Sequence, residues 1–411
     1  MMIGIQRWNV EKMLKNQEKV LVSTMKIVLV IDQFDDANNG TTISARRFAM
    51  ALREHGNEVR VIATGKPADY KYAVRQMRFF PVVEHLITSQ GMRLAVPNRH
   101  VFEKAAAWAD VVHFMMPSPL GVMGLKHVEK LGIPHTAAFH CQPENITYTL
   151  HMGNNQRVND FVYRRFRDSF FNRFTHIHCP SHMIAGQLRC HGYTAQLHVI
   201  SNGISPEYVY GKRPKEDWMA GKFNVLMVGR YAGEKRQDVL IEAVSRCRHA
   251  QEIQVILAGK GPLEKKYRAL AEKKLSHPIV MEFYTPERLR EILHMCDLYV
   301  HTADAEIEAM SCMEAFASGL VPVIAESPRS ATPQFALDGK SLFPAGDSQV
   351  LAERIDWWIE HPAEREEMER RYAEYAKQYA LERSIQQAEE MFRMAIQEQR
   401  GNAASGKERN Q

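Results

Sequence analysis

The sequence predicts an α/β protein built from two Rossmann-like domains. Short apolar runs that end in glycine or polar residues alternate with segments of helical periodicity, which is the pattern of parallel sheets covered by helices. This alternation occurs twice, on either side of a stretch rich in proline, glycine and charge that follows Gly203. The length of 411 residues is also too great for one ordinary hydrophobic core.

Composition and charge narrow the class of protein. Hydrophobic residues make up 45% of the chain and charged residues 25%, which is average for a globular protein and excludes fibrous chains. The net charge of +5 is too small to indicate a nucleic-acid partner. Prolines and polar residues interrupt the longest apolar candidate, residues 105–125, so no membrane-spanning helix is expected. Six scattered cysteines without a C-x-x-C pair indicate reduced thiols in a cytoplasm.

Residues 1–24 are interpreted as an N-terminal extension, because they lack the compact apolar segment of a secretory signal. The first domain is expected over residues 25–205. Its first strand is MKIVLVID, and TTISARRFAMALREHG follows with helical spacing and ends at Gly56, where a helix C-cap is expected. EVRVIAT is the second strand, and the alternation continues as far as LHVISNG.

The second domain is expected over residues 206–378, beginning with the linker SPEYVYGKRPKEDWMAGK. The predicted strands are FNVLMVGR, IQVILAG, IVMEFY, DLYVHT and VPVIAE, with helices between them that include residues 238–247 and 311–318. A charged helical region follows, with a break near Tyr379. We expect a C-terminal helix over residues 379–398 that packs back on the first domain, and a disordered tail over residues 399–411.

The most informative segment for function is EIEAMSCMEAFASG, residues 306–319, in which Glu306 and Glu314 lie eight residues apart around a helix start. Free backbone N–H groups at a helix N-terminus suit a diphosphate. One acid is then placed to face a sugar and the other a ribose. For an isolated pair, the more common explanation is that acidic residues favour a helix start and that Glu314 lies on a solvated face.

A second segment supports the interpretation of residues 306–319 as a binding site. Arg230 and Lys235 follow the first strand of the second domain, at the carboxyl end where such sheets bind ligands. They form a candidate anion-binding site at the edge of the sheet that would also carry Glu306. The alternative is that both are ordinary exposed side chains of a loop. In AGKGPL, Gly259 and Gly261 follow a strand, where glycine either allows close backbone approach or simply turns the chain.

Taken in order along the chain, these segments resemble the retaining, nucleotide-sugar-dependent glycosyltransferases with the GT-B fold and an E-x7-E motif. The matching blocks, within residues 25–395, are NNGTTISARR, FHCQPEN, CPS, ISNGIS, VGRYAGEKRQDVLIEA, LAGKGPLEKKY and EIEAMSCMEAFASGLVPV. The resemblance implies two domains that face each other across a cleft. It also implies that Arg230 and Lys235 neutralise the diphosphate leaving group, that Glu306 contacts the donor sugar, and that Glu314 holds the ribose hydroxyls.

Further site residues follow from the same resemblance. Those implied in catalysis are His140, Arg230, Lys235 and Glu306, and those implied in donor binding are Gly40, Thr41, Arg230, Lys235, Gly261, Ile307, Glu308, Ala309, Met310 and Glu314. Gly40 and Thr41 would close the phosphate side. His140, after an apolar strand, would lie near the anomeric centre, with a satisfied strand-end histidine as the alternative. Glu144, in the same loop, would either touch the acceptor or cap a turn.

The start of the motif departs from the family. Where the family commonly has Glu-Gly-Phe-Gly, this chain has Glu-Ile-Glu-Ala at residues 306–309, and the loss of both glycines restricts positive φ. No D-x-D sequence occurs, so we expect metal-independent transfer in which two cations and helix N–H groups stabilise the leaving group. No metal and no cofactor are expected, because the nucleotide sugar is a substrate.

Two basic, aromatic segments of the first domain indicate a membrane surface. Residues 66–104 hold seven basic and three acidic side chains, and residues 151–175 hold five and two, with phenylalanines near helical spacing in the second segment. Such stretches can rest on anionic lipid headgroups. The alternative is that the phenylalanines belong to the hydrophobic core and that the arginines lie on the solvent-exposed face of the same helix.

FHCQPENI and SPRSAT resemble in particular bacterial glycosyltransferases that modify diacylglycerol-type or ceramide-type lipids. We therefore expect a hexosyltransferase that moves glucose or galactose from a UDP-sugar to a membrane lipid, forming an α-glycoside in glycolipid biosynthesis. The protein would be cytoplasmic and peripheral on the inner face of the cell membrane. The alternatives are an enzyme of the same fold that acts on a capsule or other glycan, and a non-catalytic nucleotide-sugar-binding protein.

Overall fold

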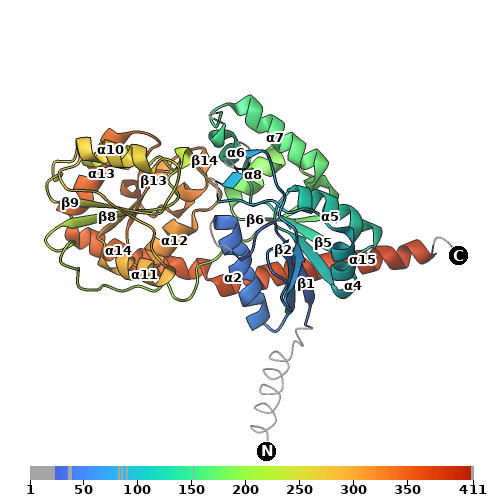
Figure 1. The fold of residues 1–411 in the computed structure, drawn as a ribbon. Coiled ribbons are helices and arrows are strands. Elements are labelled where there is room, and N and C mark those ends of the chain that lie inside the picture. Colours follow the sequence, from blue (N-terminus) through green and yellow to red (C-terminus); the bar gives the residue numbers. More distant parts are fainter. Residues whose placement is uncertain are drawn as a thin grey trace, which may run out of the picture.

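The structure is a computed structural model of the chain, and it describes residues 24–408 apart from 36–38, 82–83, 85–86, 89–90 and 151. Two domains lie side by side, each with a parallel sheet between helices (Figure 1). The predicted fold class, α/β with two Rossmann-like domains, is confirmed. The extension predicted over residues 1–24 lies outside the described residues, except for residue 24.

The N-terminal domain contains a seven-stranded sheet in the order β3-β2-β1-β4-β5-β6-β7, with all neighbours parallel. The interior strand β1 is buried along most of its length, which explains its nearly continuous apolar sequence. The strands are β1 (Lys26–Val30), β2 (Glu58–Thr64), β3 (Lys71–Val74), β4 (Val111–Phe114), β5 (His135–Ala138), β6 (His176–Cys179) and β7 (Gln196–Val199). The helices are α2 (Gly40–Glu54), α4 (Arg99–Trp108), α5 (Pro119–Lys130), α6 (Pro143–Thr149), α7 (Gln156–Ser169), η1 (Phe171–Arg173) and α8 (His182–Cys190).

Helix α2 shows how local sequence produces the predicted element. Asn39 caps its start, because the side chain accepts a hydrogen bond from the backbone N–H of Thr42 (2.9 Å). Phe48 and Leu52, four residues apart, are buried against the sheet. Gly56 follows with a φ of 88°, the left-handed conformation that ends many helices.

The C-terminal domain contains a six-stranded parallel sheet in the order β10-β9-β8-β11-β13-β15, and a separate short pair β12-β14. Its strands are β8 (Phe223–Val228), β9 (Ile253–Ala258), β10 (Val280–Glu282), β11 (Leu298–His301), β12 (Ala305–Glu306), β13 (Pro322–Glu326), β14 (Arg329–Ser330) and β15 (Leu342–Pro344). Its helices are η2 (Gly233–Lys235), α9 (Gln237–Val244), α10 (Glu264–Lys274), α11 (Pro286–Met295), α12 (Met310–Ala317), η3 (Thr332–Phe335), η4 (Gly339–Ser341), α13 (Ser348–Glu360) and α14 (Pro362–Ala376).

The chain returns to the N-terminal domain after η5 (Lys377–Tyr379), and α15 (Leu381–Glu408) lies along that domain (Figure 1). Ile385, Met391 and Phe392 of α15 are buried in one hydrophobic cluster with α2 and β1. The helix continues to Glu408, so residues 399–408 are helical where a disordered tail was expected. Good helix formers at residues 397–400 follow the last buried side chain, Ile396, and continue the helix. Residues 409–411 lie outside the described residues.

Both connections between the domains pass through one point. The backbone N–H of Ile204 donates to the carbonyl of Tyr379 (2.7 Å), and that of Leu381 donates to the carbonyl of Ile204 (3.0 Å). Gly203, with a φ of 76°, makes this approach possible, because a Cβ there would lie 2.7 Å from the Cα of Leu381. Within the described residues, no helix is long and apolar enough to cross a membrane.

Candidate active site

The N-termini of two helices, one from each domain, meet between the sheets. Gly40 begins α2, and a Cβ at this position would lie 3.6 Å from the methyl carbon of Met310, the first residue of α12. Gly40 and Met310, predicted from separate motifs, are therefore neighbours. Two helix starts with free N–H groups and positive dipole ends form an arrangement that suits a diphosphate.

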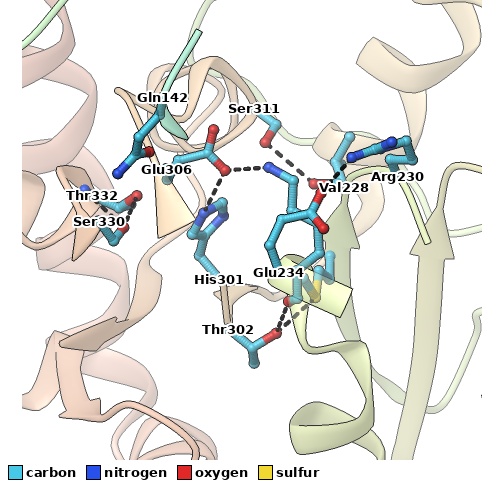
Figure 2. Close-up of polar contacts among 12 residues, drawn as sticks. Gln142, Val228, Arg230, Glu234, His301, Thr302, Glu306, Ser311, Ser330 and Thr332 are labelled. Carbon is cyan, nitrogen blue, oxygen red and sulfur yellow. Dashed lines mark hydrogen bonds and ion pairs between the residues drawn. The ribbon is translucent and has the colours of Figure 1, made fainter. Parts of the chain in front are cut away.

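Lys235 and Glu306 form an ion pair beside these helix starts. His301, at the end of β11, places its Nε2 3.7 Å from the same carboxylate oxygen (Figure 2). Burial alone would raise the pKa of Glu306, but the Lys235 charge and His301 outweigh it and lower this pKa to about 2. Glu306 is thus an anionic acceptor near neutral pH. His301 was missed in the sequence, although its place at the carboxyl end of DLYVHT was a usable signal.

Arg230 lies in the same loop and also has an acidic partner. Its Nη2 is 2.5 Å from Oε1 of Glu234, four residues along the chain. The sequence predicts Arg230 and Lys235 as two cations available to an anion; the structure brings them to one site and pairs each with a carboxylate. An ammonium has three N–H donors and a guanidinium five, so one carboxylate contact does not exhaust either group.

Glu314, predicted to hold the ribose, forms an ion pair with Arg47 of α2 across the two domains. The Glu314 side chain is 9% exposed. Arg47 also places its Nη1 3.9 Å from the sulfur of Met310. Sequence analysis missed Arg47 as a partner of Glu314, although it belongs to the NNGTTISARR block.

The loop between Glu306 and α12 makes contacts that sequence analysis did not predict. Glu308 is buried and accepts hydrogen bonds from the backbone N–H (2.8 Å) and the side-chain amide (2.6 Å) of Asn202. Burial raises the pKa of Glu308 to about 7. Ala309 adopts a φ of 68°, so the left-handed backbone expected of glycine persists on an alanine. Ile307 packs against the core of the N-terminal domain.

His140 is buried, and its Nε2 has no hydrogen-bond partner among the described residues. Burial, together with His178 and His113, lowers the pKa of His140 well below its usual value, so the ring is neutral. Glu144 follows in the same segment. It is buried and accepts a hydrogen bond from the hydroxyl of Tyr163 (3.1 Å) inside the N-terminal domain.

Helix α6 contributes contacts to the other domain that were also missed. The hydroxyl of Tyr148 donates to Asp304, which pairs with Arg329. Just before the helix, Nε2 of Gln142 donates to the carbonyl of Arg329 (2.9 Å). Gln142 stood in the FHCQPEN block, beside the two residues that were selected from it.

Gly261 acts between two loops of the C-terminal domain. A Cβ there would lie 2.5 Å from the carbonyl oxygen of Tyr231, the residue after Arg230. The glycine therefore lets the loop after β9 pack on the loop after β8. This supports the close-approach interpretation of AGKGPL, with protein backbone as the neighbour.

The two basic, aromatic segments of the N-terminal domain contain both buried and exposed aromatic side chains. Phe170 and Phe174 are buried in the core, as the alternative interpretation proposed, whereas Phe161 of α7 is 63% exposed. Arg157, Arg164 and Arg165 are exposed on the same helix. In the first segment, which is only partly described, a cavity of about 770 Å³ is lined by residues that include Lys66, Arg75, Arg78 and Arg93. Phe80 of that segment is 86% exposed.

Comparisons with known proteins give family matches for both domains and relatives of the chain. Residues 211–379 match the family "Glycosyl transferases group 1", and residues 38–208 match "Glycosyltransferase Family 4". A GDP-mannose-dependent alpha-mannosyltransferase of Mycolicibacterium smegmatis is 27% identical over 82% of this chain and 91% of its own. An alpha-monoglucosyldiacylglycerol synthase of Streptococcus pneumoniae is 20% identical over 73% of this chain and 71% of its own.

Solved structures were also matched. Sucrose-phosphate synthase of Thermosynechococcus elongatus superposes with a TM-score of 0.73 at 16% identity, covering 90% of this chain and 98% of that one. The catalytic domain of cholesterol-alpha-glucosyltransferase from Helicobacter pylori is 49% identical over 38% of this chain and 99% of its own, with a TM-score of 0.38. The chain is therefore a glycosyltransferase with the GT-B fold, in which the C-terminal domain belongs to the group 1 family and the N-terminal domain to family 4.

Proposed function

We propose that this glycosyltransferase is a retaining enzyme that moves a hexose from a nucleotide sugar to a membrane lipid, forming an α-glycoside. The observation that carries the proposal is the placement of α6. Tyr148 of this helix contacts Asp304, two residues before Glu306, whereas Ile146 in the helix and Leu150 just after it are exposed. One short helix therefore joins the cleft to an apolar surface.

That surface has the composition of a membrane-binding face. Its apolar side chains, all exposed, are Ile146 (37%), Leu150 (52%), Met152 (39%) and Phe161 (63%). The exposed arginines of α7, at residues 157, 164 and 165, lie beside Phe161 in the sequence. Apolar groups enter the headgroup region, and each nearby cation contributes roughly 1 kcal/mol on an anionic surface. The name of the Streptococcus pneumoniae relative, a diacylglycerol glycosyltransferase, supports a lipid acceptor.

The donor is proposed to be UDP-glucose or UDP-galactose. One relative is named a GDP-mannose-dependent alpha-mannosyltransferase and another an alpha-monoglucosyldiacylglycerol synthase, so the base and the sugar must be tested together. In the proposed reaction, Arg230, Lys235 and the starts of α2 and α12 stabilise the negative charge of the departing diphosphate. Glu306, kept anionic by Lys235, contacts the donor sugar, and neutral His140 lies near the anomeric carbon. Glu314 holds the ribose.

The test presents the purified protein with UDP-glucose, UDP-galactose and GDP-mannose, and with vesicles that contain diacylglycerol, ceramide or cholesterol in an anionic lipid background. Mass spectrometry identifies the product, and NMR coupling constants identify the anomeric configuration. We expect an α-glycosylated lipid from one donor. A β-product would refute retention. Transfer only to soluble oligosaccharides would refute the lipid acceptor in favour of a glycan enzyme. The double variant Arg230→Ala, Lys235→Ala is the inactive control.

A further inference from the structure

A buried amide lies beside the proposed sugar-binding carboxylate, and its oxygen has no hydrogen-bond partner among the described residues. Gln142 is 0% exposed, and its Nε2 donates to the carbonyl oxygen of Arg329 (2.9 Å). A carbonyl oxygen can only accept, so the NH₂ group must face Arg329. Oε1 is therefore turned to the other side. This oxygen is buried and has no hydrogen-bond partner in the described part of the chain.

An unpaired buried amide oxygen calls for an explanation, because nearly all buried polar atoms in folded proteins have a partner. The location of Gln142 supplies one. In the pair of short strands β12 and β14, Glu306 lies opposite Ser330, and the carbonyl held by Gln142 belongs to the preceding residue, Arg329. Figure 2 shows Gln142 next to Glu306 and Ser330, reaching in from the N-terminal domain.

The neighbouring hydroxyls do not satisfy the amide oxygen. The hydroxyl of Ser330 donates to that of Thr332 (3.0 Å), and the backbone N–H of Thr332 donates back to Ser330 (3.3 Å). The free group is thus a neutral acceptor beside an anionic one. Two acceptors side by side repel phosphate oxygens but suit hydroxyl groups, which donate. The amide oxygen of Gln142 and the carboxylate of Glu306 therefore suit the hydroxyl groups of a sugar and not a diphosphate.

We infer that Gln142 is a specificity-determining residue whose Oε1 accepts a hydrogen bond from one hydroxyl of the donor hexose. This inference rests on the proposed function, because it requires a nucleotide sugar with its hexose at Glu306. Gln142 of the N-terminal domain then binds the sugar through Oε1 while its Nε2 donates to the carbonyl oxygen of Arg329 in the C-terminal domain. Recognition of the hexose and contact between the domains are carried by the same side chain.

A double-variant cycle between the protein and the donor tests the inference. The wild type and Gln142→Met, which keeps the length and removes both polar atoms, are compared on the preferred donor and on its analogues that lack one hydroxyl at C2, C3, C4 or C6. One deoxy donor should lose about 10-fold or more in kcat/KM with the wild type, since a buried acceptor is left unpaired. With Gln142→Met, the loss at that position should shrink below about 2-fold, while penalties at other positions persist.

Gln142→Glu is the second variant, because it keeps an acceptor oxygen and should retain discrimination at that hydroxyl even where overall activity falls. Unchanged deoxy penalties in Gln142→Met at every position would overturn the inference and leave Gln142 as a tie between domains. Loss of discrimination in Gln142→Glu, with the preferred donor still used, would also count against it. Transfer to a non-lipid acceptor with the coupling intact would refute the proposed acceptor and leave this assignment standing.

Discussion

Glu308 is expected to make the stability of this protein fall as the pH rises from 5 to 8. Its buried carboxyl lies between the domains and accepts two hydrogen bonds from Asn202. Burial is the main cause of its raised pKa, about 7 against an ordinary 4.5, and the nearby Glu306 adds to it. The folded state thus binds this proton more tightly than the unfolded state. The resulting stabilisation is full below pH 4.5 and is lost as the pH rises through 7.

The size of the effect follows from the shift. A difference of about 2.5 pKa units at about 1.4 kcal/mol each corresponds to roughly 3 kcal/mol, as an order of magnitude. Glu308→Gln removes the titration and keeps a carbonyl oxygen that can accept from Asn202. The free energy of unfolding of the wild type should therefore drop by roughly 3 kcal/mol relative to the variant between pH 4.5 and 8.5.

Urea unfolding at several pH values, followed by tryptophan fluorescence and by hydrogen exchange at residues 201–203, measures this difference. Subtracting the free energy of unfolding of the variant from that of the wild type at each pH cancels the contributions of the other titrating groups. Glu326→Gln, at an exposed position, is the control and should follow the wild type. A wild-type-minus-variant difference that stays flat within about 0.5 kcal/mol would refute the reasoning, because a carboxyl with a raised pKa must produce a slope.

Four further predictions concern the site and the surface. Lys235→Ala should lower kcat by about 100-fold or more in steady-state assays, because the negative charge on the leaving group loses a positive partner. Lys235→Arg keeps the positive charge and should retain more activity. Equal activity of Lys235→Ala and the wild type would contradict the proposed role of Lys235. Ala309→Gly should raise the free energy of unfolding by roughly 0.5–1 kcal/mol by removing left-handed strain, measured by thermal unfolding, and Ala315→Gly within α12 should lower it. Replacing Arg164 and Arg165 by glutamine should weaken sedimentation with anionic vesicles by about 10-fold or more, while Lys265→Gln with Lys266→Gln, on exposed positions of α10, should not. Activity should persist in excess chelator, and restoration only by Mg²⁺ or Mn²⁺ would count against the proposed cationic site.

Much of the fold could be predicted because its signals are local. Apolar runs marked the buried strands, and Gly56 marked the end of α2. Because parallel sheets bind ligands at the carboxyl ends of their strands, the sequence predicted Arg230, Lys235 and Glu306 at one site, and the structure pairs Lys235 with Glu306. The phenylalanine stripe was ambiguous, because helical spacing alone does not tell which side a helix buries. Phe174 proved to be core and Phe161 surface.

By itself, the sequence determined that the chain folds into two α/β domains, and it indicated the sheet edge at which Arg230, Lys235 and Glu306 lie. The tertiary structure decided which charges and amides meet: Arg47 with Glu314, Asn202 with Glu308, and Gln142 with Arg329. Each of these contacts joins residues more than 100 positions apart on different domains. Spacing within a strand or helix cannot specify such pairs, because they depend on how two separately folded sheets pack against each other.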